Sequence, residues 1–124
     1  MTFFSQFNDF SSLFTAKAKF NRIDGLLLGS EVRLSGVVVG KVIKIGLNQN
    51  KPEVLISLNK GIGIPSDSSI SIQTDGLFGG KYLSLEPGGS FDHIKNGDEI
   101  IFTEDSMLIE ELLSKIIKIG ENKL

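Results

Sequence analysis

Apolar and polar residues alternate with a period of two through much of the chain between Phe14 and Phe102. Successive side chains of a β-strand point to opposite faces, so this pattern predicts strands with one buried and one solvent-facing side. Thr15–Asn21 alternates, and Val32–Leu34 and Val37–Leu47 are rich in β-branched residues. The other apolar positions that carry the pattern are Val54, Ile56, Leu58, Ile70, Ile72, Leu83, Leu85, Ile100 and Phe102.

Turn-forming residues separate these runs. The turn segments are Asp24-Gly25, Ser35-Gly36, Asn50-Lys51-Pro52, Gly61–Ser66, Asp75-Gly76, Pro87-Gly88-Gly89 and Asn96-Gly97-Asp98. About seven short strands with regular turns indicate an all-β domain, either a small barrel or a sandwich. Closure into a barrel would remove exposed strand edges.

The hydrophobic period changes at both ends of the chain. Near the start, Phe3, Phe7, Phe10 and Phe14 are spaced like one face of a helix. This segment is either a short helix or strand that docks on its own domain, or a juxtamembrane or inter-subunit segment.

The C-terminal pattern predicts an amphipathic helix over residues 104–120. Its apolar half consists of Leu108, Ile109, Leu112, Leu113, Ile116 and Ile117. Acidic residues come early and lysines late, which suits the helix dipole, and Gly120 is placed to end the helix. The apolar half packs either on its own barrel or against identical helices in an oligomer.

The composition excludes some classes of function but does not identify the function. The 124 residues fit one domain, and the net charge of −2 does not favour a nucleic-acid partner. No apolar run approaches the roughly 20 residues that span a bilayer, and the first residues do not resemble a signal peptide. The protein is therefore either cytoplasmic or targeted by a segment outside this sequence.

Catalytic and metal-binding residues are scarce. The sequence has one histidine, His93, and no cysteine. A single histidine without cysteine cannot supply the ligands of a usual zinc site. No nucleophile–base set, P-loop or paired carboxylates can be assembled from the spacing. We therefore expect no enzymatic activity, no catalytic residue, no metal and no cofactor.

The segment Asp75–Gly80 is the most informative loop. Leu77 and Phe78 stand between glycines, where a loop normally carries small polar residues. Leaving each of them in water forgoes about 1.5–3 kcal/mol of burial free energy. They therefore either fold back onto the barrel mouth or meet copies of themselves or an apolar ligand.

Five segments, in order along the chain, resemble the MCE domain family. They are Phe20–Leu26, Val32–Val42 (V-R-L-S-G-V-V-V-G-K-V), Ile64–Ser68 (I-P-S-D-S), Ile72–Leu83 (with T-D-G-L-F-G-G-K-Y-L) and Gly97–Ile100 (G-D-E-I). The resemblance spans about residues 15–101 and implies a seven-stranded MCE β-barrel with a C-terminal amphipathic helix. It also implies three regions: a juxtamembrane segment (1–13) after an anchor that is not in this sequence, the barrel (14–103) and the helix (104–120).

The resemblance implies a role in phospholipid transport as a subunit of an ABC transporter. Family members form homohexameric rings on the periplasmic side of the bacterial inner membrane, each subunit held by one N-terminal helix. The loop matching Leu77 and Phe78 lines the central pore, and the apolar C-terminal helices pack around its axis. The implied partners are phospholipid, the permease and ATPase subunits, and a periplasmic lipid carrier.

Two other functions compete with lipid transport on sequence grounds. A small barrel of this kind could bind a protein or peptide with no lipid role. A nucleic-acid-binding barrel would need basic and aromatic residues interleaved on one face, and the chain has one tyrosine and no tryptophan. We therefore expect no nucleic-acid partner.

Overall fold

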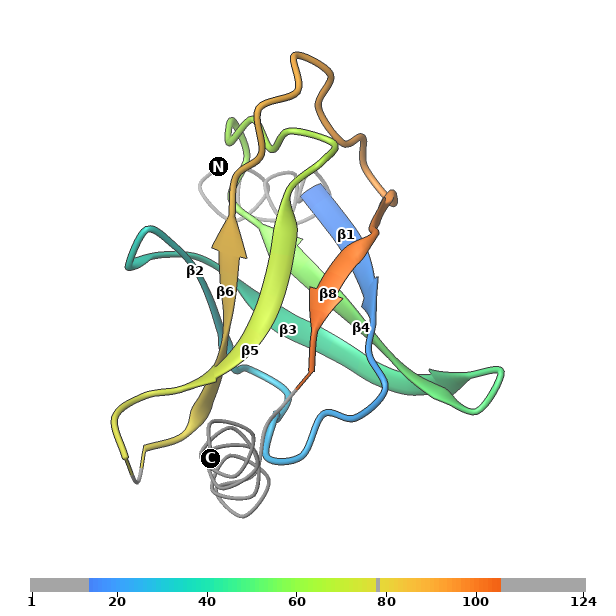
Figure 1. Cartoon of the computed structure of the whole chain (residues 1–124), viewed down its shortest axis with the longest axis vertical. Helices are drawn as coiled ribbons and strands as arrows, with labels where there is room; N and C mark the ends of the chain where they lie inside the picture. Colours follow the sequence, from blue (N-terminus) through green and yellow to red (C-terminus); the bar gives the residue numbers. More distant parts are fainter. Residues whose placement is uncertain (1–13, 78, 106–124) are drawn as a thin grey trace, which may run out of the picture.

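The chain folds into one closed eight-stranded sheet in a computed structural model, which describes residues 14–77 and 79–105 (Figure 1). The strands are β1 (Phe14–Lys19), β2 (Glu31–Leu34), β3 (Val37–Asn48), β4 (Lys51–Leu58), β5 (Ser69–Thr74), β6 (Lys81–Glu86), β7 (Glu99–Ile100) and β8 (Phe102–Glu104). Their order in the sheet is β7-β1-β4-β3-β2-β6-β5-β8. The predicted all-β barrel is confirmed.

The two short C-terminal strands close the barrel. β7 pairs in parallel with β1, and β8 pairs in parallel with β5 at the other edge of the sheet. Ile101 alone separates them, so β7 and β8 are two halves of one seventh strand. This agrees with the seven strands that the family resemblance implied.

The alternation fails where the last strand changes partners. Ile100 is buried, but Phe102, expected on the same face, is 55% exposed, and Ile101 is exposed as well. The expectation that Phe102 lies inside is therefore wrong. The chain passes from the edge of β1 to the edge of β5 at Ile101, and a period-two pattern holds only within one continuous strand.

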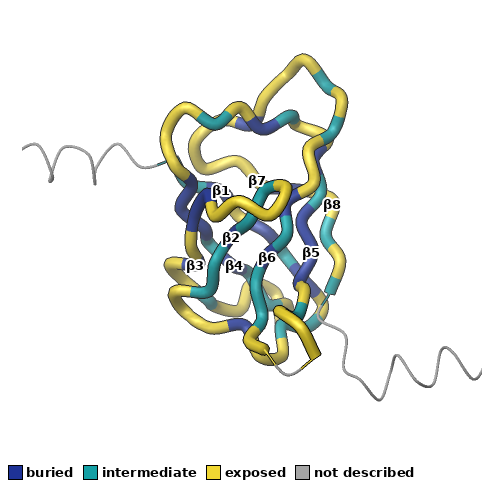
Figure 2. Tube along the Cα trace, turned by 90° about the vertical axis from the view of Figure 1, so that its left-hand side faces the viewer, coloured by how far each residue is buried: buried dark blue, intermediate teal, exposed yellow. Residues whose placement is uncertain are grey.

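The interior is filled by the apolar face of the sheet. It contains Ala16, Ala18, Val32, Val39, Val42, Val54, Ile56, Leu58, Ile70, Ile72, Leu83, Leu85 and Ile100, with Phe20, Leu26, Ile64 and Ile94 from the loops. Figure 2 shows buried stretches within the strands and exposed loops at both ends. Every buried side-chain nitrogen or oxygen of the described residues has a hydrogen-bond partner, as expected for a well-packed core.

Tight turns join the central strands. Ser35 and Gly36 have φ values of 51° and 83°, which is the left-handed geometry of a two-residue hairpin turn. The next hairpin turns at Gln49 and Asn50, with φ values of 55° and 65°. This turn comes one residue earlier than predicted, because Lys51 and Pro52 already pair with β3.

Gly40 lies where β3 passes closest to its neighbour β4. It pairs with Leu58, and a Cβ atom on Gly40 would collide with the carbonyl oxygen of Ser57. Farther along β3, the register against β4 shifts at Ile43. Such a bulge bends a strand and increases its twist, which helps the long β3 curve around a small barrel.

Hydrogen bonds join the β4–β5 loop to the β6–β7 loop at the upper end in Figure 1. The Asp67 carboxylate accepts bonds from the backbone N–H groups of Gly89 (3.1 Å) and Ser90 (3.0 Å). Ser68 Oγ accepts a bond from Gly88 N, also at 3.1 Å. The bonds from Ser90 and Gly89 lower the pKa of Asp67 below its ordinary value.

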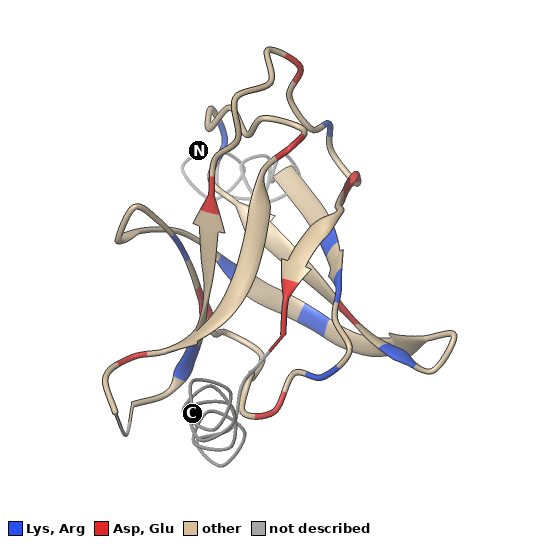
Figure 3. Ribbon diagram, in the orientation of Figure 1, with Lys and Arg blue, Asp and Glu red and all other residues tan. Residues whose placement is uncertain are grey.

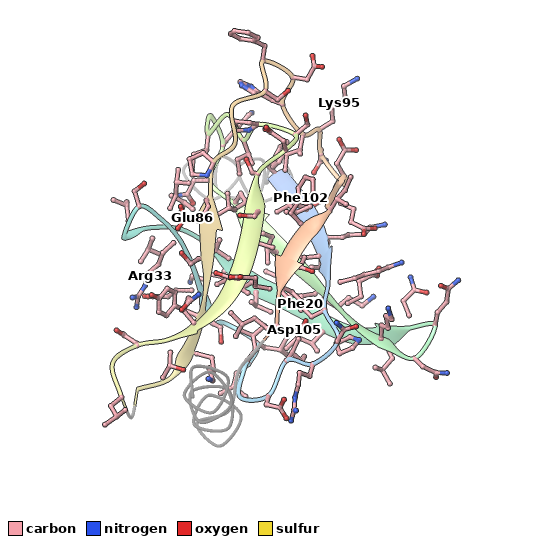
Figure 4. The ribbon with its side chains drawn as sticks, viewed as in Figure 1. Phe20, Arg33, Glu86, Lys95, Phe102 and Asp105 are labelled. Atoms are coloured by element: carbon pink, nitrogen blue, oxygen red, sulfur yellow. The ribbon has the colours of Figure 1, made fainter. Side chains whose placement is uncertain are left out.

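The predicted N-terminal segment (1–13) and most of the predicted C-terminal helix lie outside the described residues. Asp105 is the last described residue, and its carboxylate accepts hydrogen bonds from Asn21 N (2.7 Å) and Asn21 Nδ2 (3.0 Å). Figure 4 shows Asp105 near Phe20 at the lower end of the barrel. None of the described residues forms a helix with the length and apolarity needed to cross a membrane.

Candidate functional site

The loop between β5 and β6 projects from the barrel at the end opposite the β6–β7 loop (Figure 1). The two strands pair in antiparallel register from Ser69–Glu86 to Thr74–Lys81. One further backbone hydrogen bond follows the strand pair, in which Asp75 N donates to Gly80 O at 2.9 Å. The residues beyond this bond form a short tip that carries Leu77.

Two glycines make this tight loop possible for different reasons. Gly76 has a φ of 72°, a region that L-residues with a side chain rarely adopt. A Cβ atom on Gly79 would collide with the carbonyl oxygen of Asp75. Gly76 is thus required by its backbone conformation and Gly79 by the lack of space beside Asp75.

Leu77 is 70% exposed at this tip. Of the two alternatives for this loop, the described part of the chain therefore shows Leu77 directed away from its own barrel. Phe78, the second predicted residue, lies outside the described residues. An exposed leucine on a constrained loop leaves apolar surface available to a partner or an apolar ligand.

Polar contacts hold the base of the loop. Lys81 Nζ donates a 2.6 Å hydrogen bond to Thr74 Oγ1 across the strand pair. The aliphatic part of Lys81 also covers Gly25, where an added Cβ would lie 2.9 Å from Lys81 Cγ. The loop base is therefore connected to the β1–β2 segment as well as to its own hairpin.

Arg33 of β2 reaches the same base from the neighbouring strand (Figure 4). Its Nη2 donates to Asp75 Oδ2 (3.1 Å) and to Glu31 Oε1 (2.8 Å), and its Nε donates to the same Glu31 oxygen at 3.0 Å. The guanidinium carbon lies 4.0 Å from the centre of the Tyr82 ring. Bonds to Asp75 and then to Glu31 raise the pKa of Arg33 further, so it remains a cation.

The Arg33 cluster was not among the predicted site residues. β2 and β6 are parallel neighbours, with Arg33 opposite Ser84, although about fifty residues separate them in the sequence. Local periodicity cannot reveal such pairing. The available signal was an arginine at an outer strand position and an aspartate directly before the apolar loop, within two of the family-like segments.

Exposed lysines lie on β1 and β3, the two strands that flank β4 (Figure 3). Lys17 and Lys44 both pair with Leu55 of β4, and Lys41 lies farther along β3. The only aromatic residue in these three strands is Phe14, which packs against the core. These strands therefore lack the stacking surface that single-stranded nucleic acid uses.

The six apolar residues predicted for the axial helix lie outside the described residues, and His93, which was not predicted as a site residue, lies on a loop. The six are Leu108, Ile109, Leu112, Leu113, Ile116 and Ile117. His93 is on the exposed β6–β7 loop, with its ring against Gly63. Within residues 14–77 and 79–105, no group of three or more His, Cys, Asp or Glu side chains is arranged to hold a metal ion.

A known protein family matches the barrel. The profile described as MlaD protein matches residues 14–88, which is more than half of the chain. This range contains every residue of the Arg33 and loop-base contacts and the whole β5–β6 loop, from Asp75 to Gly80.

Curated relatives match most of the chain. The intermembrane phospholipid transport system binding protein MlaD of Haemophilus influenzae is 36% identical over 110 residues, covering 84% of this chain and 66% of that protein. The protein of the same name from Escherichia coli is 36% identical over 112 residues, covering 84% and 61%. The chain thus spans just under two thirds of the length of these relatives.

A solved structure has the same fold. One chain of the Acinetobacter MlaFEDB complex in its ATP-bound Vtrans1 conformation superposes with a TM-score of 0.78 and 25% sequence identity. The match covers 85% of this chain and 81% of that chain. The neighbour is thus part of a multi-component complex that binds ATP.

Proposed function

The chain belongs to the MlaD protein family, and on that basis we propose that it transports phospholipid between the inner and outer bacterial membranes. It would act as the ring-forming subunit of an ABC transporter, with an apolar pore on the ring axis. The relatives named for intermembrane phospholipid transport and the neighbour within an ATP-bound complex support this proposal.

The observation that carries the proposal is the exposed Leu77 on a braced loop. Copies of the loop around an axis would form an apolar collar of Leu77 and Phe78. An acyl chain gains about 0.8 kcal/mol for each CH₂ that leaves water, so such a collar would shelter lipid tails. Contacts of this kind are non-directional, which lets a lipid enter and leave without being trapped.

Other exposed apolar residues support assembly of several copies. Leu27 and Leu28 are exposed before β2, and Val37 and Val38 are exposed at the start of β3. Apolar side chains that are exposed on one subunit can be covered by a neighbouring copy. We propose a homohexamer, with the apolar half of residues 108–117 packing around the axis.

The proposed placement follows from the family. The ring would stand on the periplasmic side of the inner membrane, held by a single N-terminal helix outside this sequence. Permease and ATPase subunits would contact it at the membrane, and a periplasmic carrier protein would exchange phospholipid with it. None of these steps requires a metal, a cofactor or a chemical reaction by this chain.

Replacing both loop residues tests the pore. Leu77→Asn combined with Phe78→Asn should leave the ring assembled but reduce phospholipid transport strongly, because the collar becomes polar. The measurements are native mass, extraction of co-purified lipid, and complementation of outer-membrane lipid asymmetry in cells.

Leu47→Asn is the matched control, since Leu47 is 75% exposed but lies on the β3–β4 hairpin. Normal complementation by the double variant would contradict the pore role. A monomer that carries no lipid would favour instead a protein-binding barrel.

A further inference from the structure

Arg33 connects three elements at the base of the Leu77 loop. It lies in β2, stacks on Tyr82 of β6, and donates to Asp75 directly after β5. β2 pairs with β6, and β6 pairs with β5, so the arginine spans the width of two strand pairings. Its side chain therefore bonds the loop base to β2.

We propose that Arg33 is a positioning residue that fixes the direction in which the β5–β6 loop presents Leu77. This inference rests on the proposed pore function for the meaning of that direction. The position of the loop is a property of the chain itself and can be measured without lipid.

Contacts with Glu31 and Tyr82, outside the loop, orient the Arg33 side chain. Glu31 lies two residues earlier on β2, on the same face of the strand, and accepts bonds from both Nε and Nη2. The Tyr82 ring supports the flat side of the guanidinium. Because its orientation is set by Glu31 and Tyr82, the remaining bond to Asp75 transmits that orientation to the loop. A lysine could not make this arrangement, because it lacks the planar set of donors.

The loop needs such a constraint. Three of its residues are the glycines Gly76, Gly79 and Gly80, which permit many backbone conformations. The Asp75–Gly80 and Lys81–Thr74 bonds close the loop within its own hairpin. Lys81 also contacts Gly25 in the β1–β2 segment, whereas the Arg33–Asp75 bond joins the loop to the strand β2. In a symmetric ring every subunit presents the loop tip in the same direction. A change in that direction would therefore be repeated in every copy.

A role in folding alone does not fit the exposure of this pair. The two carboxylates are largely in solvent, since the Asp75 side chain is 62% exposed and that of Glu31 is 46% exposed, while the Arg33 side chain is 23% exposed. Ion pairs at such positions contribute little to the free energy of unfolding. Loss of the arginine should thus leave the barrel folded while changing the loop.

The experiment uses the absence of cysteine from the chain. Leu77→Cys gives a single site for a nitroxide label, whose mobility is read by electron paramagnetic resonance on full-length protein mixed with excess unlabelled chains. The backgrounds are wild type, Arg33→Ala, Asp75→Asn and both together. Glu53→Gln is the matched control, because Glu53 accepts a hydrogen bond from Asn48 in the β3–β4 hairpin and makes none to the described residues of the β5–β6 loop. A label on Leu47→Cys reports any general increase in the mobility of the barrel.

Arg33→Ala and Asp75→Asn should each increase the mobility of the label at position 77, and the double variant should increase it no further. The label at position 77 in the Glu53→Gln background, and the label at position 47 in the Arg33→Ala background, should be unchanged. Equal mobility at position 77 in wild type and Arg33→Ala would overturn the inference, and so would additive effects of the two substitutions.

Transport is measured on the same variants and tests a separate point. A mobile label in Arg33→Ala together with normal transport by Leu77→Asn/Phe78→Asn would refute the pore and leave the positioning role intact. An unresponsive label would refute the positioning role whatever the transport result.

Discussion

Gly40 and Gly46 lie in the same strand, β3, but in different surroundings. At Gly40 a side chain would meet the backbone of β4, whereas at Gly46 nothing lies within 4 Å of an added Cβ. Neither glycine has a positive φ, so the difference between them is one of space rather than backbone conformation. The absence of a side chain at Gly40 is what lets β3 and β4 approach at this point of the barrel.

Gly40→Ala should therefore destabilise the barrel. Overpacking costs about 1–3 kcal/mol, and the obstacle here is a carbonyl oxygen that cannot rotate away. Gly46→Ala should instead be neutral or raise the free energy of unfolding by about 0.4–1 kcal/mol, because it restricts the unfolded chain. Urea denaturation followed by circular dichroism measures both. Equal stabilities of the two variants would show that β3 can shift away from β4 at no cost.

The burial of single residues was predictable where a strand keeps the same neighbours along its length. Val54, Ile56, Ile70, Leu83 and Leu85 were expected inside from alternation, and all of them are buried. Phe102 was misplaced because its strand changes partners one residue earlier. The pattern reports a residue's face within a strand but carries no information on where a strand ends its pairing.

At the scale of elements, Asp67 joins two loops through hydrogen bonds to backbone groups. It precedes β5, and its bonds are to Gly89 and Ser90 in the β6–β7 loop. A Cβ atom on Gly88 would collide with Asp67 Oδ1, so the carboxylate occupies the space that this glycine leaves. The I-P-S-D-S segment thus has a structural role that the sequence alone did not reveal.

The Asp67 contact should make stability depend on pH. The pKa of Asp67 is lower in the folded chain than its ordinary value of 3.8, so the contact stabilises the fold above about pH 4. This contribution is lost as the pH falls through the lower, folded pKa. Asp67→Asn should therefore have a lower Tm than wild type at pH 7, and the difference should shrink towards pH 3. A constant difference in Tm across that range would assign the loss to packing instead of charge.

The positions of the strands in the sequence were more predictable than the pairing of the strands in the sheet. Strand positions followed from alternation and turn residues, and the hairpin at Ser35-Gly36 was placed correctly. The parallel pairings of β2 with β6, β1 with β7 and β5 with β8 were not predictable, because each joins segments far apart in the sequence. The Arg33 cluster depends on the first of these pairings, which is why it emerged only from the structure.

At the scale of the whole molecule, apolar surface remains uncovered in a single copy. Exposed residues occur at several places on the barrel, among them Leu28, Val37, Leu77 and Phe91. The charges are mixed and the net charge is small, so electrostatic repulsion does not oppose association of copies. A single copy thus leaves apolar surface that a ring of copies would cover.

The C-terminal pattern provides the last test of assembly. Residues 108–117 place their apolar side chains on one half of a predicted helix, and the described chain ends at Asp105, which is bonded to Asn21 beside the barrel end. Deleting residues 106–124 should leave the circular dichroism of the barrel intact but lower the oligomer mass measured by light scattering, because each copy loses an apolar face.

A variant on the apolar half separates this role from the mere presence of a tail. Leu112→Ser with Ile116→Ser should weaken the oligomer as truncation does, whereas Glu111→Gln with Lys115→Gln changes the opposite half of the predicted helix and should not. An unchanged mass after truncation would assign the apolar half to the chain's own barrel, and the ring would then depend on surfaces such as Leu27, Leu28, Val37 and Val38 alone.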